Sequence, residues 1–125
     1  MNALSPSLQP EAGSTLSKAV VRTAALLHIK QSSIARILGI SAATASRLCA
    51  GSYVLNPARE KEWELALLLV RMFRSLDAVL GHGDNAQQWL KGQNLALNGC
   101  PAELIETAEG LVRVLHYLDA HRGRI

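Results

Sequence analysis

The chain has 125 residues, of which 49% are hydrophobic, 18% charged and 4% aromatic, which suits one domain or two small helical units and excludes wholesale disorder. Leu and Ala together occur 39 times and Val and Ile 13 times. Because Leu and Ala favour helices whereas Val and Ile favour strands, the composition predicts an all-α protein.

The first elements are a tail and a helix. Residues 1–15 are punctuated by proline, glycine and serine, and we expect a flexible N-terminal tail there. From Ser17 onward, apolar residues recur at three- and four-residue spacing, which predicts a helix. This helix is expected to end at residues 28–30.

Two short helices are predicted next. The first spans 32–38 and is ended by Gly39, since glycine readily adopts a positive φ. Ser41 is placed to cap the second, which runs to about Ala50 and is closed by Gly51.

A long helix is predicted after the connection at residues 53–56. Asn56 followed by Pro57 is a start signal, with a capping side chain and a proline at the first helical position. The helix is expected to run to Leu80 and end at Gly81. Because its middle is apolar nearly all the way round, it should lie at the centre of the fold or in an oligomer.

Short helices complete the predicted bundle. Asp84 is expected to cap a short helix, irregular chain follows over 92–100, and a helix is predicted over 101–106. Thr107 is expected to cap the last helix, over 108–121. The sequence therefore predicts no strand.

Residues 31–49 have the spacing of a helix-turn-helix. Ala35 supplies the small residue where two helices cross, and Gly39 supplies the turn four residues later. The second helix then offers small polar side chains and one arginine, a surface that can enter a major groove about 12 Å wide. The candidate DNA-binding residues are Gln31, Ser32, Ser41, Ala42, Thr44, Ser46 and Arg47. An ordinary helical hairpin with a glycine corner is the alternative.

The charge distribution is compatible with DNA contact without establishing it. The chain carries a formal net charge of +3, of which residues 1–60 contribute +4 and residues 61–125 contribute −1. The basic character therefore lies in the half that holds the helix-turn-helix. A mildly basic surface without a nucleic-acid partner explains the charge equally well.

The first half resembles the Xre-like helix-turn-helix family, with Ala45 where a larger aliphatic residue is usual. The second half resembles the toxin-binding domain of Xre/MbcA/ParS-type antitoxins. The residues that carry this second resemblance are Trp89, Leu90, Asn94, Leu97, Gly99, Pro101, Leu104, Ile105, Thr107, Glu109, Gly110, Val114 and Leu118. Together the two resemblances cover residues 16 to about 119.

The resemblance implies two partners. Such antitoxins bind and block a RES-domain toxin that consumes NAD, and they repress their own operon by binding operator DNA. It further implies that the last helix and tail lie against the entrance to the toxin's active site. The candidate toxin-binding residues are Glu109, Arg113, His116, Tyr117, His121, Arg122, Arg124 and Ile125. Structural alternatives are a core position for Trp89, a helix-dipole role for Glu109 and a solvated terminus for the tail.

Catalysis is not expected. The four histidines lack metal-ligand spacing, and the chain has no glycine-rich phosphate loop. Its two cysteines form neither a disulfide framework nor a zinc site, so we predict no metal and no cofactor. The longest apolar run has six residues, too short for a membrane span, and the N-terminus lacks the features of a signal peptide. We therefore expect a cytoplasmic protein that does not contact a membrane.

The sequence thus predicts an all-α protein with an N-terminal helix-turn-helix bundle, a long connecting helix and a small C-terminal helical toxin-binding domain. The expected divisions are a tail at 1–15, a DNA-binding domain at 16–55 and a toxin-binding domain at 56–125. A homodimer is expected, since helix-turn-helix proteins read two half-sites. The alternatives are a transcriptional regulator without a toxin and a scaffold whose helix-turn-helix is vestigial.

Overall fold

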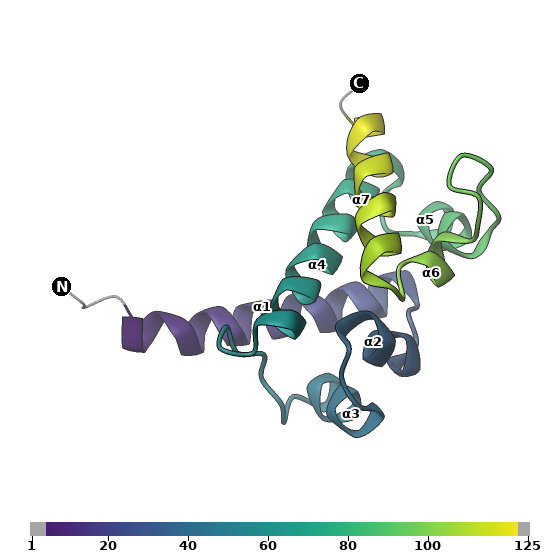
Figure 1. The fold of residues 1–125 in the computed structure, drawn as a ribbon. Helices are drawn as coiled ribbons and strands as arrows, with labels where there is room; N and C mark the ends of the chain where they lie inside the picture. The colour runs from purple at the N-terminus through teal and green to yellow at the C-terminus, as the bar shows by residue number, and fades with distance from the viewer. Residues whose placement is uncertain (1–4, 123–125) are drawn as a thin grey trace.

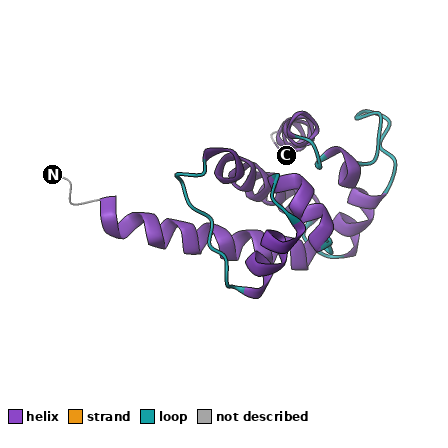
Figure 2. Cartoon of the chain, turned by 60° about the horizontal axis from the view of Figure 1, so that its bottom comes forward, coloured by secondary structure: helices purple, strands orange, loops and turns teal. Residues whose placement is uncertain are grey.

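The computed structural model describes residues 5–122, and side chains from residue 11 onward. Every named element in that range is a helix, which confirms the all-α prediction (Figures 1 and 2). The helices are α1 (Ser5–Leu27), α2 (Gln31–Leu38), α3 (Ala42–Ala50), α4 (Glu60–Leu80), α5 (Asp84–Lys91), α6 (Pro101–Leu104) and α7 (Ala108–Arg122).

The predicted start of the first helix at Ser17 is wrong, because α1 begins at Ser5. Its inner part is held by the connection between α3 and α4. The Ser17 hydroxyl accepts a hydrogen bond from the Leu55 amide at 2.9 Å and donates to the Gly13 carbonyl at 2.7 Å. A Cβ added at Gly13 would lie 2.3 Å from the Leu55 carbonyl oxygen. Gly13 therefore permits a close backbone approach within a helix.

The turn and caps of α2 and α3 are as predicted. Gly39 has φ of 70°, a left-handed conformation that glycine adopts without the clash of a Cβ. The Ser41 side chain accepts a hydrogen bond from the Thr44 amide at 3.0 Å and so caps α3. Local chemistry alone therefore determines this corner.

The long helix starts three residues later than Asn56–Pro57 predicted, and its first residue is Glu60. The Asn56 side-chain oxygen accepts from the Ala58 amide at 2.9 Å, which makes a turn before the helix. An asparagine side chain can accept hydrogen bonds from nearby backbone amides and so compete with helix formation. At Asn56 this bond forms a turn in place of the first turn of the helix. The predicted end at Leu80 and Gly81 is correct.

As predicted, α4 is the central helix. It packs against α1 and α2 on one side and against α5 and α7 on the other, and its largest contact is with α7. The buried apolar side chains form one cluster that runs from α1 through α4 to α7. The two halves of the chain therefore share a core, and α4 belongs to both.

The helix boundaries of the second half differ in detail from the prediction. Asp84 is the first residue of α5 and makes no capping bond, because Gly83 occupies the cap position. Helix α6 ends at Leu104, two residues before the expected end. The Thr107 hydroxyl accepts from the Gly110 amide at 3.1 Å, so the predicted cap of α7 is confirmed.

Gly110 allows α7 to start directly against the end of α6. A Cβ added at Gly110 would lie 1.9 Å from the Leu104 carbonyl oxygen. This close approach lets α7 pack alongside α4 (Figure 1). In the part of the chain that the structure describes, no helix is both long and apolar enough to cross a membrane.

Candidate functional site

The helix-turn-helix leaves most of the predicted DNA-binding residues exposed. Helix α3 and the start of α2 supply them, and all are exposed except Thr44, which is half-buried. The exposed members are Gln31, Ser32, Ser41, Ala42, Ser46 and Arg47. The surface of α3 thus consists of short side chains and one long base, which suits insertion into a groove.

The opposite face of α3 is fixed in the core. Ala45 is 0% exposed and Leu48 is buried beside it, while Ile34 and Ala35 are buried from α2. The smaller aliphatic residue at position 45 is therefore fully enclosed. A rigid support of this kind holds the exposed face of α3 in a defined orientation.

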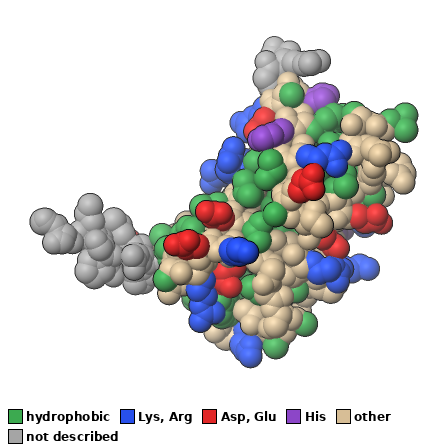
Figure 3. All heavy atoms as spheres, viewed as in Figure 1, with side chains coloured by type: hydrophobic (Ala, Val, Ile, Leu, Met, Phe, Trp, Pro, Cys, Tyr) green, Lys and Arg blue, Asp and Glu red, His purple; other side chains and the backbone are tan. Residues whose placement is uncertain are grey.

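Arg47 is available for a partner. Its side chain is exposed, and no acidic group pairs with it within residues 5–122. In the view of Figure 3, basic side chains are interspersed with acidic ones and do not form one continuous patch. The surface therefore offers individual phosphate or base contacts from α3.

Cys49 serves packing. It lies on α3 at a groove shared with α1, and burial raises the pKa of its thiol. A raised pKa keeps the thiol protonated and unreactive. Within residues 5–122, no cluster of three His, Cys, Asp or Glu side chains is arranged to hold a metal ion.

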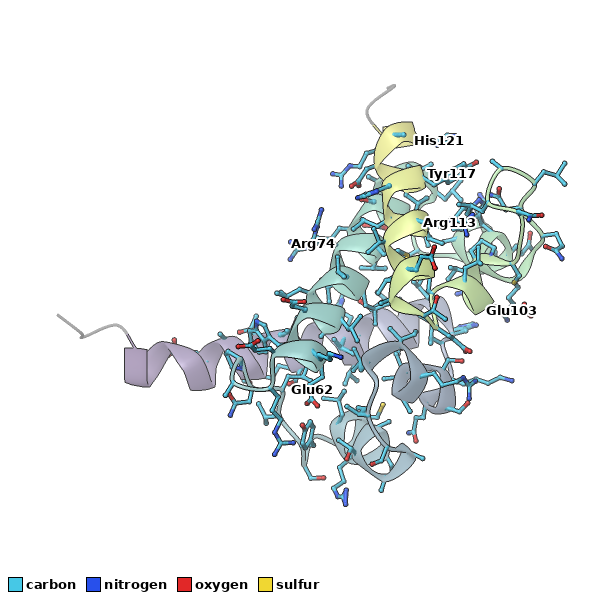
Figure 4. The ribbon with its side chains drawn as sticks, in the orientation of Figure 1. Glu62, Arg74, Glu103, Arg113, Tyr117 and His121 are labelled. Atoms are coloured by element: carbon cyan, nitrogen blue, oxygen red, sulfur yellow. The ribbon has the colours of Figure 1, made fainter. Side chains whose placement is uncertain are left out.

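Three of the predicted toxin-binding residues follow one another along α7. Arg113, Tyr117 and His121 are four residues apart, which places them on one side of the helix (Figure 4). The rings of Tyr117 and His121 have centroids 4.3 Å apart. The His121 Nδ1 donates to the Tyr117 carbonyl oxygen at 2.8 Å, which fixes the orientation of the imidazole.

Trp89 of α5 extends this row. Its ring stacks on Tyr117 with centroids 6.1 Å apart and an interplanar angle of 18°. Trp89 is half-buried and packs against the core. The core position proposed for Trp89 is therefore correct in part, and the ring also supports the surface of α7. We call Trp89, Tyr117 and His121 the aromatic row.

The remaining toxin-binding candidates do not form one site. Glu109 and His116 are exposed on α7. Arg122 turns toward α4, where its Nη1 donates to the Ser75 hydroxyl at 3.1 Å, and Ser75 in turn donates to Asp119. Arg122 therefore ties α7 to α4. Two further candidates, Arg124 and Ile125, lie outside the described residues.

An ion pair that sequence reasoning missed joins the two halves of the molecule. Arg36 of α2 forms two hydrogen bonds with the Glu106 carboxylate, at 2.8 and 3.2 Å. The hydrogen bond from Arg36 lowers the pKa of Glu106, and the same bond raises the pKa of Arg36. The two residues are 70 positions apart in sequence, so no local sequence pattern predicts the pair.

A second contact supports this junction. The Gln87 side chain of α5 donates to the Leu26 carbonyl at the end of α1, at 3.0 Å. The loop before α6 also contains an internal hydrogen bond, which is made by Asn94. Its side-chain oxygen accepts from the Leu97 amide at 3.0 Å.

The fold and these surfaces define a class of protein, a helix-turn-helix module joined through a shared helix to a second helical unit. Residues 7–71 match the antitoxin Xre-like helix-turn-helix domain, and residues 75–124 match the antitoxin Xre/MbcA/ParS C-terminal toxin-binding domain. The first match covers more than half of the chain, so the chain belongs to the Xre-like helix-turn-helix antitoxin family. In a comparison with curated proteins, none matches the chain.

These matches support a type II antitoxin with a DNA-binding and a toxin-binding domain. Both families are typically non-enzymatic. The gap between the matched segments falls inside α4, the helix that the two halves share. The family assignment therefore agrees with the arrangement of the fold.

Proposed function

We propose that this antitoxin neutralises a RES-domain toxin that consumes NAD, and that it represses its own operon. The observation that supports this most is the pairing of an Xre-like helix-turn-helix with a toxin-binding domain in one chain. In this proposal, residues 16–55 bind DNA and residues 56–125 bind the toxin. The chain itself performs no catalysis and acts in the cytoplasm, where the operator lies.

On the DNA side, α3 enters the major groove. Its small exposed side chains permit close approach, and the exposed guanidinium of Arg47 reaches a base edge or a phosphate. The hydroxyls and amide of the remaining candidates contact phosphates on either side of the groove. These candidates are Gln31, Ser32, Ser41, Thr44 and Ser46, while Ala42 contributes a methyl group.

On the toxin side, α7 presents the contact residues. The candidate residues along this helix are exposed to solvent to different degrees. They are Glu109, Arg113, His116, Tyr117 and His121. Arg122, although it bonds to Ser75, keeps an exposed side chain. Through these residues, α7 would cover the approach to the toxin's active site.

Co-expression tests the toxin assignment. The RES-domain protein encoded beside this chain's gene should arrest growth and lower cellular NAD, and the antitoxin should restore both. The two proteins should also elute together in size-exclusion chromatography. Separate elution without restored growth would leave a transcriptional regulator that has no toxin partner.

The role of the tail is tested by a truncation after Arg122. This truncation leaves the whole of α7 intact, since the helix ends there, and removes Arg124 and Ile125. If the tail blocks the active site, the shortened antitoxin should still bind the toxin but should neutralise it less well. Full neutralisation would confine the inhibitory surface to α7 and the residues before it.

We also propose that the antitoxin is a homodimer. Helix-turn-helix proteins use two copies to read two half-sites about one helical turn apart. An apolar groove between α1 and α4 offers a surface for the second copy, with Leu67 43% exposed beside Trp63 and Val70. Analytical ultracentrifugation should give twice the chain mass, and Leu67→Glu should shift the protein toward the monomer.

A further inference from the structure

Leu95 is the most exposed of the large apolar side chains that the structure describes. It is 97% exposed, whereas the next two, Val54 and Leu67, are 50% and 43% exposed. Leu95 lies in the loop between α5 and α6, which projects from the body beside α7 (Figure 1). A leucine in this position contributes almost nothing to the core of its own chain.

The loop holds Leu95 in one place. The Asn94 and Gly99 backbones are paired by two hydrogen bonds of 2.9 and 3.2 Å, and the Asn98 amide donates to the Leu95 carbonyl at 3.2 Å. Leu97 is buried and anchors the base of the loop. The backbone that carries the side chain is therefore an ordered turn, so that little backbone conformational entropy remains to be lost on binding.

Arg113 connects this loop to α7. Its Nη2 donates to the Leu97 carbonyl at 2.7 Å, and Arg113 follows the same side of α7 as Tyr117 and His121 (Figure 4). Arg113 thus links the loop that carries Leu95 to the side of α7 that carries Tyr117 and His121. The loop and α7 both lie within residues 75–124, which match the toxin-binding domain.

We propose that Leu95 is the apolar anchor of the toxin interface. The side chain enters an apolar pocket on the toxin, and the aromatic row makes further contacts with the same partner. An anchor surrounded by flatter contacts that exclude water is the usual arrangement of a tight protein interface. The occupant is taken to be the RES-domain toxin because Leu95 lies in the toxin-binding domain. This inference therefore rests on the proposed function.

The test compares four antitoxins against the purified RES-domain toxin by titration calorimetry. They are the wild type, Leu95→Ala, Leu95→Asp and the control Val54→Asp, which adds the same charge at another exposed apolar position. Leu95→Ala should bind about 10-fold more weakly or worse, and Leu95→Asp more weakly still. Val54→Asp should bind the toxin like the wild type, and both Leu95 variants should keep the wild-type melting temperature and DNA affinity.

Asn94→Ala tests the ordered display separately. It removes the side-chain bond to the Leu97 amide but leaves Leu95 in place. Weaker toxin binding by this variant, in a protein that still folds and binds DNA, supports an anchor that depends on a rigid loop. If Asn94→Ala binds the toxin with wild-type affinity, the ordering of the loop by this bond does not contribute to binding.

The outcomes separate this inference from the proposed function. If the wild type binds the toxin and both Leu95 variants bind equally well, the anchor is wrong while the toxin assignment stands. If the wild type itself fails to bind, both are wrong. If Leu95→Asp instead changes the sedimentation of the antitoxin alone, the surface is a contact between copies of this chain, and the inference is overturned.

Discussion

Helix α3 in the first half of the molecule exposes hydroxyls, methyl groups and one arginine along a regular helix, whereas the second half exposes a leucine on a loop and stacks two aromatic rings between α5 and α7. Short polar side chains suit the nucleic-acid groove proposed for the first surface, because bulky side chains would not fit there. The second surface exposes a large apolar side chain, which is the kind of contact that we propose for the toxin. Two surfaces of different chemistry therefore share one core through α4.

The difference also concerns how each surface is supported. The orientation of α3 depends on residues close in sequence, such as Gly39 in the turn and the capping residue Ser41. The second surface depends on contacts between α5, the loop and α7, such as the bond from Arg113 to Leu97. Substitutions should therefore separate the two surfaces, and the following predictions are ordered by the size of the expected effect.

Gly110→Ala should disrupt the second half most strongly. Alanine favours helices, but here its Cβ would meet the Leu104 carbonyl at 1.9 Å. We expect the free energy of unfolding to fall by about 2–3 kcal/mol, measured by urea denaturation. The control Gly83→Ala places a Cβ in open space, and because Gly83 is the N-cap of α5 it should still cost about 0.5–1 kcal/mol, which is clearly less than Gly110→Ala. Equal stability of the two variants would contradict the close packing of α6 and α7.

Arg47→Ala should weaken specific DNA binding by about 1–3 kcal/mol if the guanidinium contacts a base, and it should leave toxin binding unchanged. The measurement is a mobility-shift titration with operator and with random DNA at fixed salt. Lys91→Ala removes the same charge from an exposed position on α5, outside the groove proposed for the dimer, and serves as the control. If both variants lose the same affinity for both DNAs, Arg47 contributes charge alone.

Ser41→Ala should lower stability by about 1 kcal/mol, since it removes the side-chain acceptor of the Thr44 amide. Ser41→Asp keeps an acceptor and should retain stability, but its negative charge should repel phosphate and reduce DNA binding. Thermal unfolding and DNA titration of the same two proteins separate the two roles. A Ser41→Asp variant that binds operator DNA normally would exclude Ser41 from the phosphate contacts.

The smallest effect should come from the ion pair between Arg36 and Glu106, because such exposed pairs contribute little. The arginine lowers the pKa of Glu106, so the stabilisation is present above the usual carboxyl pKa and is lost as the pH falls through the lowered value. Glu106→Gln should therefore reduce the loss of stability between pH 6 and pH 3 measured by urea unfolding. The matched control Glu109→Gln removes an exposed acid on α7 that forms no ion pair within residues 5–122, and it should not reduce the loss of stability as Glu106→Gln does.

Local chemistry made much of the architecture predictable. Gly39, Ser41 and Thr107 act on backbone groups within a few residues, so their sequence signals and their observed roles agree. The apolar character of the long helix on nearly every side likewise predicted a place at the centre of the fold or in an oligomer, and α4 is central. The predictions were wrong where a distant contact or a competing local bond decides the outcome, as at the start of α1, where Gly13 packs against Leu55.

The two candidate sites also differ in how far the sequence predicted them. The exposed face of α3 follows from helical spacing, so the sequence identified its residues together. Leu95 and Leu97 are two positions apart in one loop, yet one is 97% exposed and the other is buried. No pattern in the sequence distinguishes them, because the burial of Leu97 depends on helices that are distant along the chain.

The sequence by itself determined the helical class, the helix-turn-helix and the resemblance to an antitoxin, because these depend on spacing within single elements. The tertiary structure decided which side chains remain outside the shared core, how the aromatic row is assembled, and that Arg36 meets Glu106. These features depend on how α4 brings the two halves together. That packing is a property of the whole chain, since each buried contact requires surfaces from elements far apart in sequence.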